Sequence, residues 1–152
     1  MADKLRPRLD RLQELAKQVN AATDDAGRVV QGVETYLSDQ LHIGVTGSVV
    51  LESDEDPPAG HYFRRELFYG RHGERFRIYV RHFMEFEGSV ETDEETLWAN
   101  CPRDVKLMSF NRLPDLLDQL VNCLEATLEQ VRLNSETIQA LLPQPKAKGA
   151  KS

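Results

Sequence analysis

Cysteine is scarce in this chain. Cys101 and Cys123 are the only two cysteines among 152 residues, and they form no CxxC pattern. The sequence therefore predicts neither a disulfide framework nor a zinc site. Long apolar runs are also missing, because no stretch approaches the ~18 residues that a membrane span requires. The opening residues are charged and include no apolar signal-peptide region, so we expect a protein of the reducing cytoplasm.

Signatures of catalysis are equally sparse. Residues 44–48 contain two glycines but no lysine at the spacing of a phosphate-binding loop. His61 and His82 are expected to face each other across a hairpin, yet the spacing indicates no third metal ligand. Cys101 has no histidine close in sequence that would act as its base. We therefore predict no catalytic, cofactor-binding or metal-ligating residue, and no enzyme activity.

The composition is that of a single acidic globular domain. Hydrophobic residues make up 40% and charged residues 29%, with a net charge of −6 and a pI near 5.2. This charge disfavours indiscriminate binding to nucleic acid or to an anionic membrane. We expect one α+β domain over residues 1–142. Residues 143–152, with three lysines, are expected to form a disordered basic tail.

Two long apolar seams are the dominant positive feature. Each keeps an alternating spacing of four and three residues, which is typical of helices that pack against other helices. The first seam predicts a continuous helix over residues 4–39 and consists of Leu5, Leu9, Leu12, Ala16, Val19, Thr23, Ala26, Val30, Val33 and Leu37. The second predicts a helix over residues 113–142 and consists of Leu113, Leu117, Leu120, Leu124, Thr127, Val131, Asn134, Ile138 and Leu141.

These seams predict a chain that pairs with itself or with another protein. A small sheet does not bury so much apolar helix surface. Self-association into a homodimer is the most direct way to bury the remainder. An antiparallel coiled coil of the two helices within one chain is the alternative. A break of the first helix near Asp24 is a further alternative, which we disfavour because a turn would normally reset the spacing.

Between the helices, the pattern predicts a three-stranded antiparallel meander. Residues 43–52, 61–69 and 74–84 alternate as strands do, and residues 53–60 read as an acidic loop with two prolines. Gly70–Gly73 are expected to form the hairpin turn.

Short helices are expected after the meander. Thr92 and Glu95 fit a capping box that would open a short helix through Trp98. Residues 103–111 are expected to form another short helix, and Pro114 suits the first turn of the last long helix. Trp98 is interpreted as part of the core.

Arginine and aromatic residues are concentrated between His61 and Phe83. This segment contains six arginines against two glutamates, and seven of the eleven aromatic residues of the chain. The expected register places Phe68 opposite Arg75, with one face formed by Tyr62, Arg64, Phe68, Arg75, Arg77, Tyr79 and Arg81. The other face is the predicted core and consists of Phe63, Leu67, Tyr69, Phe76, Ile78 and Val80.

The arginine-rich face has two interpretations. It is either a solvated sheet face stabilised by cross-strand pairs or a docking surface for a partner. We predict a non-enzymatic protein-interaction module, a homodimeric adaptor or chaperone-like protein that binds a protein partner through the seams and this face. The alternative is a nucleic-acid or phosphorylated-ligand binder that uses the same face.

Overall fold

The computed structural model describes residues 2–56 and 60–144, with Asp56 described by its backbone alone. The fold is α+β, with a long helix at each end of a four-stranded antiparallel sheet whose strands lie in the order β1-β2-β3-β4. The elements are α1 (Ala2–Thr35), a π-helical turn η1 (Tyr36–Gln40), β1 (Gly47–Asp56), β2 (His61–His72), β3 (Arg75–Phe86), β4 (Ser89–Leu97), a 3₁₀ turn η2 (Trp98–Asn100), α2 (Arg103–Phe110) and α3 (Leu113–Leu141).

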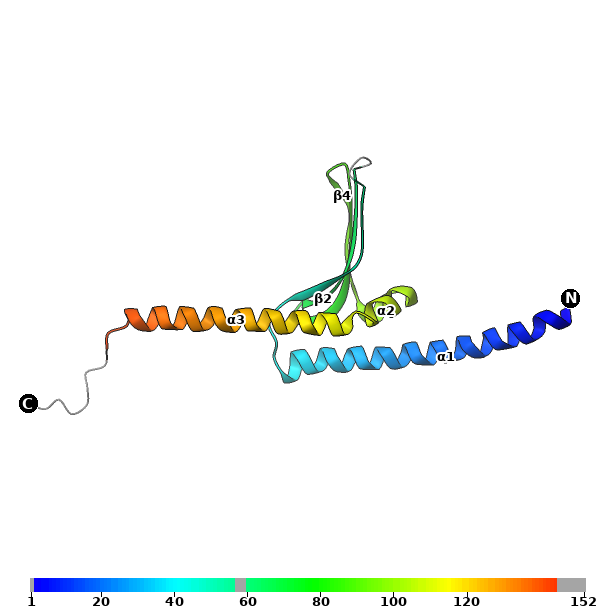
Figure 1. The fold of residues 1–152 in the computed structure, drawn as a ribbon, viewed down its shortest axis with the longest axis horizontal. Helices are drawn as coiled ribbons and strands as arrows, with labels where there is room; N and C mark the ends of the chain where they lie inside the picture. Colours follow the sequence, from blue (N-terminus) through cyan, green and yellow to red (C-terminus); the bar gives the residue numbers. More distant parts are fainter. Residues whose placement is uncertain (1, 57–59, 145–152) are drawn as a thin grey trace, which may run out of the picture.

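The two long helices run in the same direction below the sheet, but they are displaced along their axes (Figure 1). The first half of α1 projects to one side of the molecule, and the second half of α3 projects to the other. Both predicted long helices are confirmed, and α1 continues through Asp24 without a break. The antiparallel pairing of α1 and α3 within one chain does not occur, because the helices share one direction.

The sheet has a covered base and a projecting arm. In Figure 1 the strands rise away from the helices, so that the far ends of all four strands extend beyond the helical layer. The core lies at the base, where α1 packs against β3 and α3 packs against β1 and β2. Buried side chains from the helices and from one sheet face form a single cluster that includes Val30, Leu67, Ile78, Trp98 and Leu116.

The face assignment of the hairpin is confirmed at the base of the sheet. Leu67, Tyr69, Ile78 and Val80 are buried in the core, as the alternation predicts. Phe76 is half-buried against this cluster. The Tyr69 hydroxyl donates a hydrogen bond to the Ile43 carbonyl at 3.0 Å, so its polar end is satisfied.

The predicted short helix through Trp98 is wrong, because residues 89–97 form a fourth strand instead. Glu87 and Gly88 both have positive φ angles, 50° and 80°, which suit a two-residue hairpin turn. This turn returns the chain alongside β3, where Thr92 lies opposite Met84 and Glu95 lies opposite Arg81. Cross-strand partners therefore override the local capping signal.

The predicted register of the arginine-rich hairpin is wrong by four residues. The turn consists of Gly73 and Glu74, so Phe68 lies opposite Tyr79 and not opposite Arg75. Gly73 has a φ of 67° and takes the conformation that the turn demands. A shift of four residues preserves the alternation, which explains why the faces are right although the pairs are not.

The first strand also differs from its predicted bounds. β1 begins at Gly47, after the predicted start at residue 43, and continues to Asp56 through part of the predicted loop. A side chain at Gly47 would lie 2.8 Å from Leu120 Cδ2, so glycine allows α3 to approach the strand closely. Residues 57–59 of the loop and 145–152 of the tail lie outside the described residues. The helices predicted at 103–111 and 113–142 are confirmed within one or two residues.

Candidate functional site

The seam of α1 is buried over only half of its length. Ala26, Val30 and Leu37 lie in the core, whereas Leu9 and Leu12 are each 62% exposed on the half that projects from the molecule. Because the spacing continues unbroken, the exposed side chains extend the same face that packs on the sheet. We call the exposed apolar part, together with the adjacent Leu15, the α1 stripe, which consists of Leu5, Leu9, Leu12, Leu15 and Val19.

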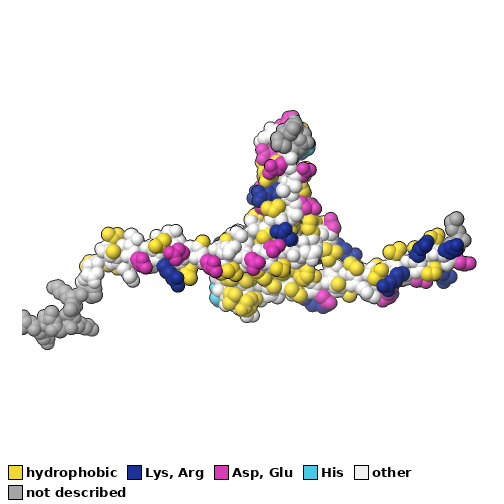
Figure 2. Space-filling model, in the orientation of Figure 1, with side chains coloured by type: hydrophobic (Ala, Val, Ile, Leu, Met, Phe, Trp, Pro, Cys, Tyr) yellow, Lys and Arg dark blue, Asp and Glu magenta, His cyan; other side chains and the backbone are white. Residues whose placement is uncertain are grey.

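The seam of α3 shows the same division in the opposite order along the chain. Leu113 and Leu120 of the seam are buried together with the neighbouring Leu116, and the apolar residues beyond them are exposed. We call the exposed apolar part, together with the adjacent Leu128, the α3 stripe, which consists of Leu124, Leu128, Val131, Ile138 and Leu141. Figure 2 shows hydrophobic side chains on both projecting helices and gathered where the helices overlap. Large apolar side chains exposed in rows of this kind are typical of an interaction site.

A second candidate surface lies on the sheet arm, on the face away from the core. Tyr62, Arg64, Glu66, Arg81 and Phe83 line a shallow hollow of 180 Å³ there. The rings of Tyr62 and Phe83 meet edge to face, with centroids 5.7 Å apart. Arg64 Nη1 donates to the Tyr62 hydroxyl at 3.2 Å, and its Nε lies 2.6 Å from Glu66 Oε1. The structure thus brings together three of the predicted partner-binding residues and adds Phe83.

Arg81 is held by a carboxylate on the fourth strand. Its Nε and Nη2 donate to the two Asp93 carboxylate oxygens at 2.8 and 3.0 Å, and its guanidinium also lies over the Phe83 ring. The hydrogen bond from Arg81 lowers the pKa of Asp93 below its ordinary value, which favours the ionised pair. Sequence reasoning missed Asp93 because it placed this residue in a helix.

Phe68 and Tyr79, two further predicted binding residues, form a stack nearer the base of the sheet. Their rings are 5.3 Å apart and nearly parallel, at 6°. Tyr79 is buried, and burial raises the pKa of its hydroxyl. The stack therefore lies between the hollow and the base of the sheet. Because Tyr79 is buried, it has little exposed surface for contact with a partner.

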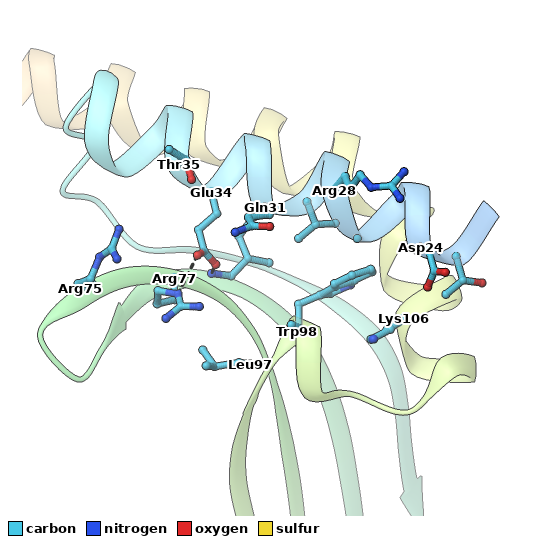
Figure 3. Close-up of a pocket in the computed structure, with 15 residues that line it drawn as sticks. Asp24, Arg28, Gln31, Glu34, Thr35, Arg75, Arg77, Leu97, Trp98 and Lys106 are labelled. Atoms are coloured by element: carbon cyan, nitrogen blue, oxygen red, sulfur yellow. Dashed lines mark hydrogen bonds and ion pairs between the residues drawn. The ribbon is translucent and has the colours of Figure 1, made fainter. Parts of the chain in front are cut away.

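The remaining predicted binding residues, Arg75 and Arg77, reach a different place. They line a groove of 510 Å³ between α1, β3 and η2 (Figure 3). Arg75 pairs with Asp39 at 3.2 Å, and Arg77 Nε donates to Glu34 Oε1 at 2.7 Å. These two arginines do not belong to the hollow on the arm. The predicted seven-residue surface therefore divides into the hollow, the groove and the stack of Phe68 on Tyr79.

Glu34 on α1 closes the open edge of β3. β4 pairs with β3 only as far as Leu97 opposite Tyr79. Beyond that point the backbone N–H of Ile78 donates to Glu34 Oε2 at 2.8 Å. One carboxylate therefore satisfies both a strand edge and the Arg77 guanidinium. The sequence gives no local signal for this role, because the two partners are more than forty residues away from Glu34.

Replacing Glu34 with alanine is expected to lower the free energy of unfolding by about 1–3 kcal/mol, because the buried Ile78 N–H loses its acceptor. Glu34→Gln retains an amide oxygen for this N–H and is expected to lose less. Asp39→Ala is the matched control, since its pair with Arg75 is exposed and contributes about 0–1 kcal/mol. Urea unfolding followed by circular dichroism measures all three. Equal losses for Glu34→Ala and Asp39→Ala would contradict the edge-closing role.

The histidines and cysteines do not converge on a reactive site. His61 lies opposite Phe86 and His82 lies opposite Arg65, so the predicted facing of the two histidines is wrong. Burial raises the pKa of the Cys101 thiol, and its Sγ lies 3.5 Å from the Leu97 carbonyl oxygen. In residues 2–56 and 60–144, no group of three or more histidine, cysteine or acidic residues is placed to hold a metal ion.

Comparisons of the chain with models of protein families, with curated proteins and with solved structures found no match. Among the described helices, neither α1 nor α3 nor any shorter helix combines the length and the apolar content that crossing a membrane requires. The interpretation of function therefore depends on the surfaces described above.

Proposed function

We propose that this chain is a non-enzymatic protein-interaction module, an adaptor or chaperone-like protein that forms a homodimer through its long helices. The observation that supports this proposal most strongly is the pair of exposed stripes on α1 and α3. Leu9, Leu12, Val131 and Ile138 are each more than half exposed, although their spacing is that of a packed seam. Covering them removes apolar surface from water, which favours association. The proposed compartment is the cytoplasm.

In this proposal the sheet arm presents the second surface, which binds a protein partner. The arm extends beyond the helical layer, and its hollow combines two arginines with two aromatic rings. Arginine and tyrosine are enriched at the energetic centres of protein interfaces. The residues proposed to contact the partner are Tyr62, Arg64, Arg81 and Phe83.

The alternative, a nucleic-acid or phosphorylated-ligand binder, is less well supported by the charges of the arm. Five of the six hairpin arginines lie in ion pairs with carboxylates: Arg64, Arg65, Arg75, Arg77 and Arg81. The sixth, Arg71, lies over the Phe76 ring. Phosphate contacts depend on cationic groups that displace counterions, and most of these guanidinium groups are already neutralised within the chain.

The double variant Arg64→Ala, Arg81→Ala tests the partner surface. We expect the wild-type protein to retain a stoichiometric protein partner from a nuclease-treated lysate of its native cells, and the variant to lose it. Arg28→Ala is the control, because Arg28 lies on α1, away from the arm, and forms an exposed pair with Asp25. Circular dichroism verifies folding of the double variant, which loses the partly exposed pairs Arg64–Glu66 and Arg81–Asp93. Equal capture by the double variant would contradict this assignment.

Capture from the same lysate without nuclease treatment distinguishes the adaptor from the nucleic-acid or phosphorylated-ligand binder. A protein that binds phosphate groups would retain nucleic acid, with an affinity that falls steeply as salt is raised. That result, in the absence of a protein partner, would replace the adaptor proposal.

A further inference from the structure

The two stripes lie on helix segments of matching length. The exposed runs are residues 2–22 of α1 and, apart from the half-buried Cys123, residues 121–141 of α3, 21 residues each. At 1.5 Å per residue, each segment is about 31 Å long. The segments project in opposite directions from the shared core, while the two helices run in the same direction (Figure 1).

The two segments also carry opposite charge. Residues 2–22 of α1 contain five basic and three acidic residues, for a net charge of +2. Residues 121–141 of α3 contain three acidic residues and one basic residue, for a net charge of −2. Opposite potentials favour α1 next to α3, whereas two copies of either segment would place like charges together.

We propose that a second copy of this chain covers both stripes in a staggered arrangement. This inference rests on the self-association proposed above and specifies its geometry. Each projecting segment of α1 packs antiparallel against the projecting segment of α3 from the partner subunit. A two-fold axis perpendicular to the helices reverses their direction, so it places these two segments side by side at each end of the dimer.

The equal lengths of the two segments also set a register. When antiparallel segments of equal length lie side by side with their ends aligned, residue n of α1 lies opposite residue 143 − n of the partner's α3. The seams then coincide without adjustment. Leu5 lies opposite the partner's Ile138, Leu12 opposite the partner's Val131, and Val19 opposite the partner's Leu124. A shift of one residue would place seam residues opposite the polar faces.

The staggered arrangement covers more apolar surface than pairing of identical helices. A dimer that joined α1 only to the same segment of the partner would leave both α3 stripes in water. A dimer joined through α3 would leave both α1 stripes exposed. In the staggered dimer, two copies cover all four stripes, and the interface closes on itself without further growth.

Cysteine cross-linking between separately prepared variants tests this geometry. Leu12→Cys is introduced in one preparation and Val131→Cys in another, each with Cys123→Ser, and the two are mixed and mildly oxidised. Cys101 stays because it is buried. A disulfide needs Cα atoms within about 7 Å. We therefore expect a covalent dimer from the mixture and none above background from either variant alone, because only the mixture brings two cysteines within this distance.

Leu12→Cys mixed with Leu141→Cys is the register control. Leu141 lies ten residues beyond Val131, or about 15 Å along the helix, so this mixture is expected to cross-link slowly. Rapid cross-linking of Leu12→Cys with itself would overturn the staggered geometry while leaving a homodimer intact. Absence of cross-links together with a monomeric mass in solution would overturn both the geometry and the self-association on which it rests.

Discussion

An aspartate in place of Leu12 is expected to dissociate the homodimer into folded monomers. Leu12 is 62% exposed in the single chain, so the substitution leaves the monomer's free energy of unfolding within about 0.5 kcal/mol. In the dimer the same carboxylate would be buried against apolar side chains, which is strongly unfavourable without a partner charge. We expect the dissociation constant to rise at least about 100-fold, which corresponds to about 2.7 kcal/mol.

Ala21→Asp is the matched control for Leu12→Asp. Ala21 lies nine residues further along α1, which is two and a half turns and places it on the opposite side of the helix from Leu12, and it is exposed. Both substitutions add one negative charge to the same segment. Sedimentation velocity over a concentration series measures the dissociation constants. A dimer that is equally stable in both variants would exclude the α1 stripe from the interface.

Replacing Trp98 with alanine is expected to have the largest effect on the fold, a loss of about 3–5 kcal/mol. Trp98 is 4% exposed and connects the end of β4 to the helices. A side chain on Gly27 of α1 would lie 3.6 Å from the ring, and Lys106 Nζ of α2 lies 5.4 Å from its centroid. Removing the ring would leave a cavity among three elements, because their backbones relax only partly.

Ser109→Ala separates the hydrogen bond of Trp98 from its packing. The Trp98 Nε1–H donates to Ser109 Oγ at 2.8 Å, and both groups are buried. Without this acceptor the indole N–H is left unsatisfied, at a cost of about 1–3 kcal/mol. In denaturant unfolding we expect the free energy of unfolding to be highest for the wild type, lower for Ser109→Ala and lowest for Trp98→Ala. A loss below 1 kcal/mol for Trp98→Ala would contradict its role in the core.

The helices and the faces of the central hairpin could be predicted because their signals are local and periodic. The four-three spacing from Leu5 to Leu37 and from Leu113 to Leu141 defines both long helices. Alternation likewise places Leu67 and Ile78 in the core. The pairing of Phe68 was wrong because a shift by an even number of residues preserves alternation, and only the backbone of Gly73 identifies the turn.

The fourth strand and the edge contact depend on partners far away in the sequence. Thr92 and Glu95 satisfy a local helix-capping pattern, but hydrogen bonds to β3 and the pair of Asp93 with Arg81 decide the outcome. In the sequence, Glu34 looks like any polar residue of an amphipathic helix. Its role becomes visible only in the folded structure, where the edge of β3 lies beside it. Tertiary contacts of this kind are not encoded in a local pattern.

The structure was also needed to show how much of each seam remains exposed. The sequence shows two complete seams, but it does not show that the core uses only Ala26 to Leu37 of one and Leu113 to Leu120 of the other. The displacement of α1 relative to α3 decides which halves remain exposed. The sequence predicts only that the helices pair, whereas the displacement identifies the α1 and α3 stripes as the surfaces available for pairing.

Sedimentation equilibrium of the unmodified protein is the most direct test of self-association, which is the central claim. We predict a mass of twice the 17.3 kDa of the chain at micromolar concentration, because apolar contacts dominate the interface. A mass of one chain over the same concentrations would contradict the account, because the α1 and α3 stripes would then be exposed in solution.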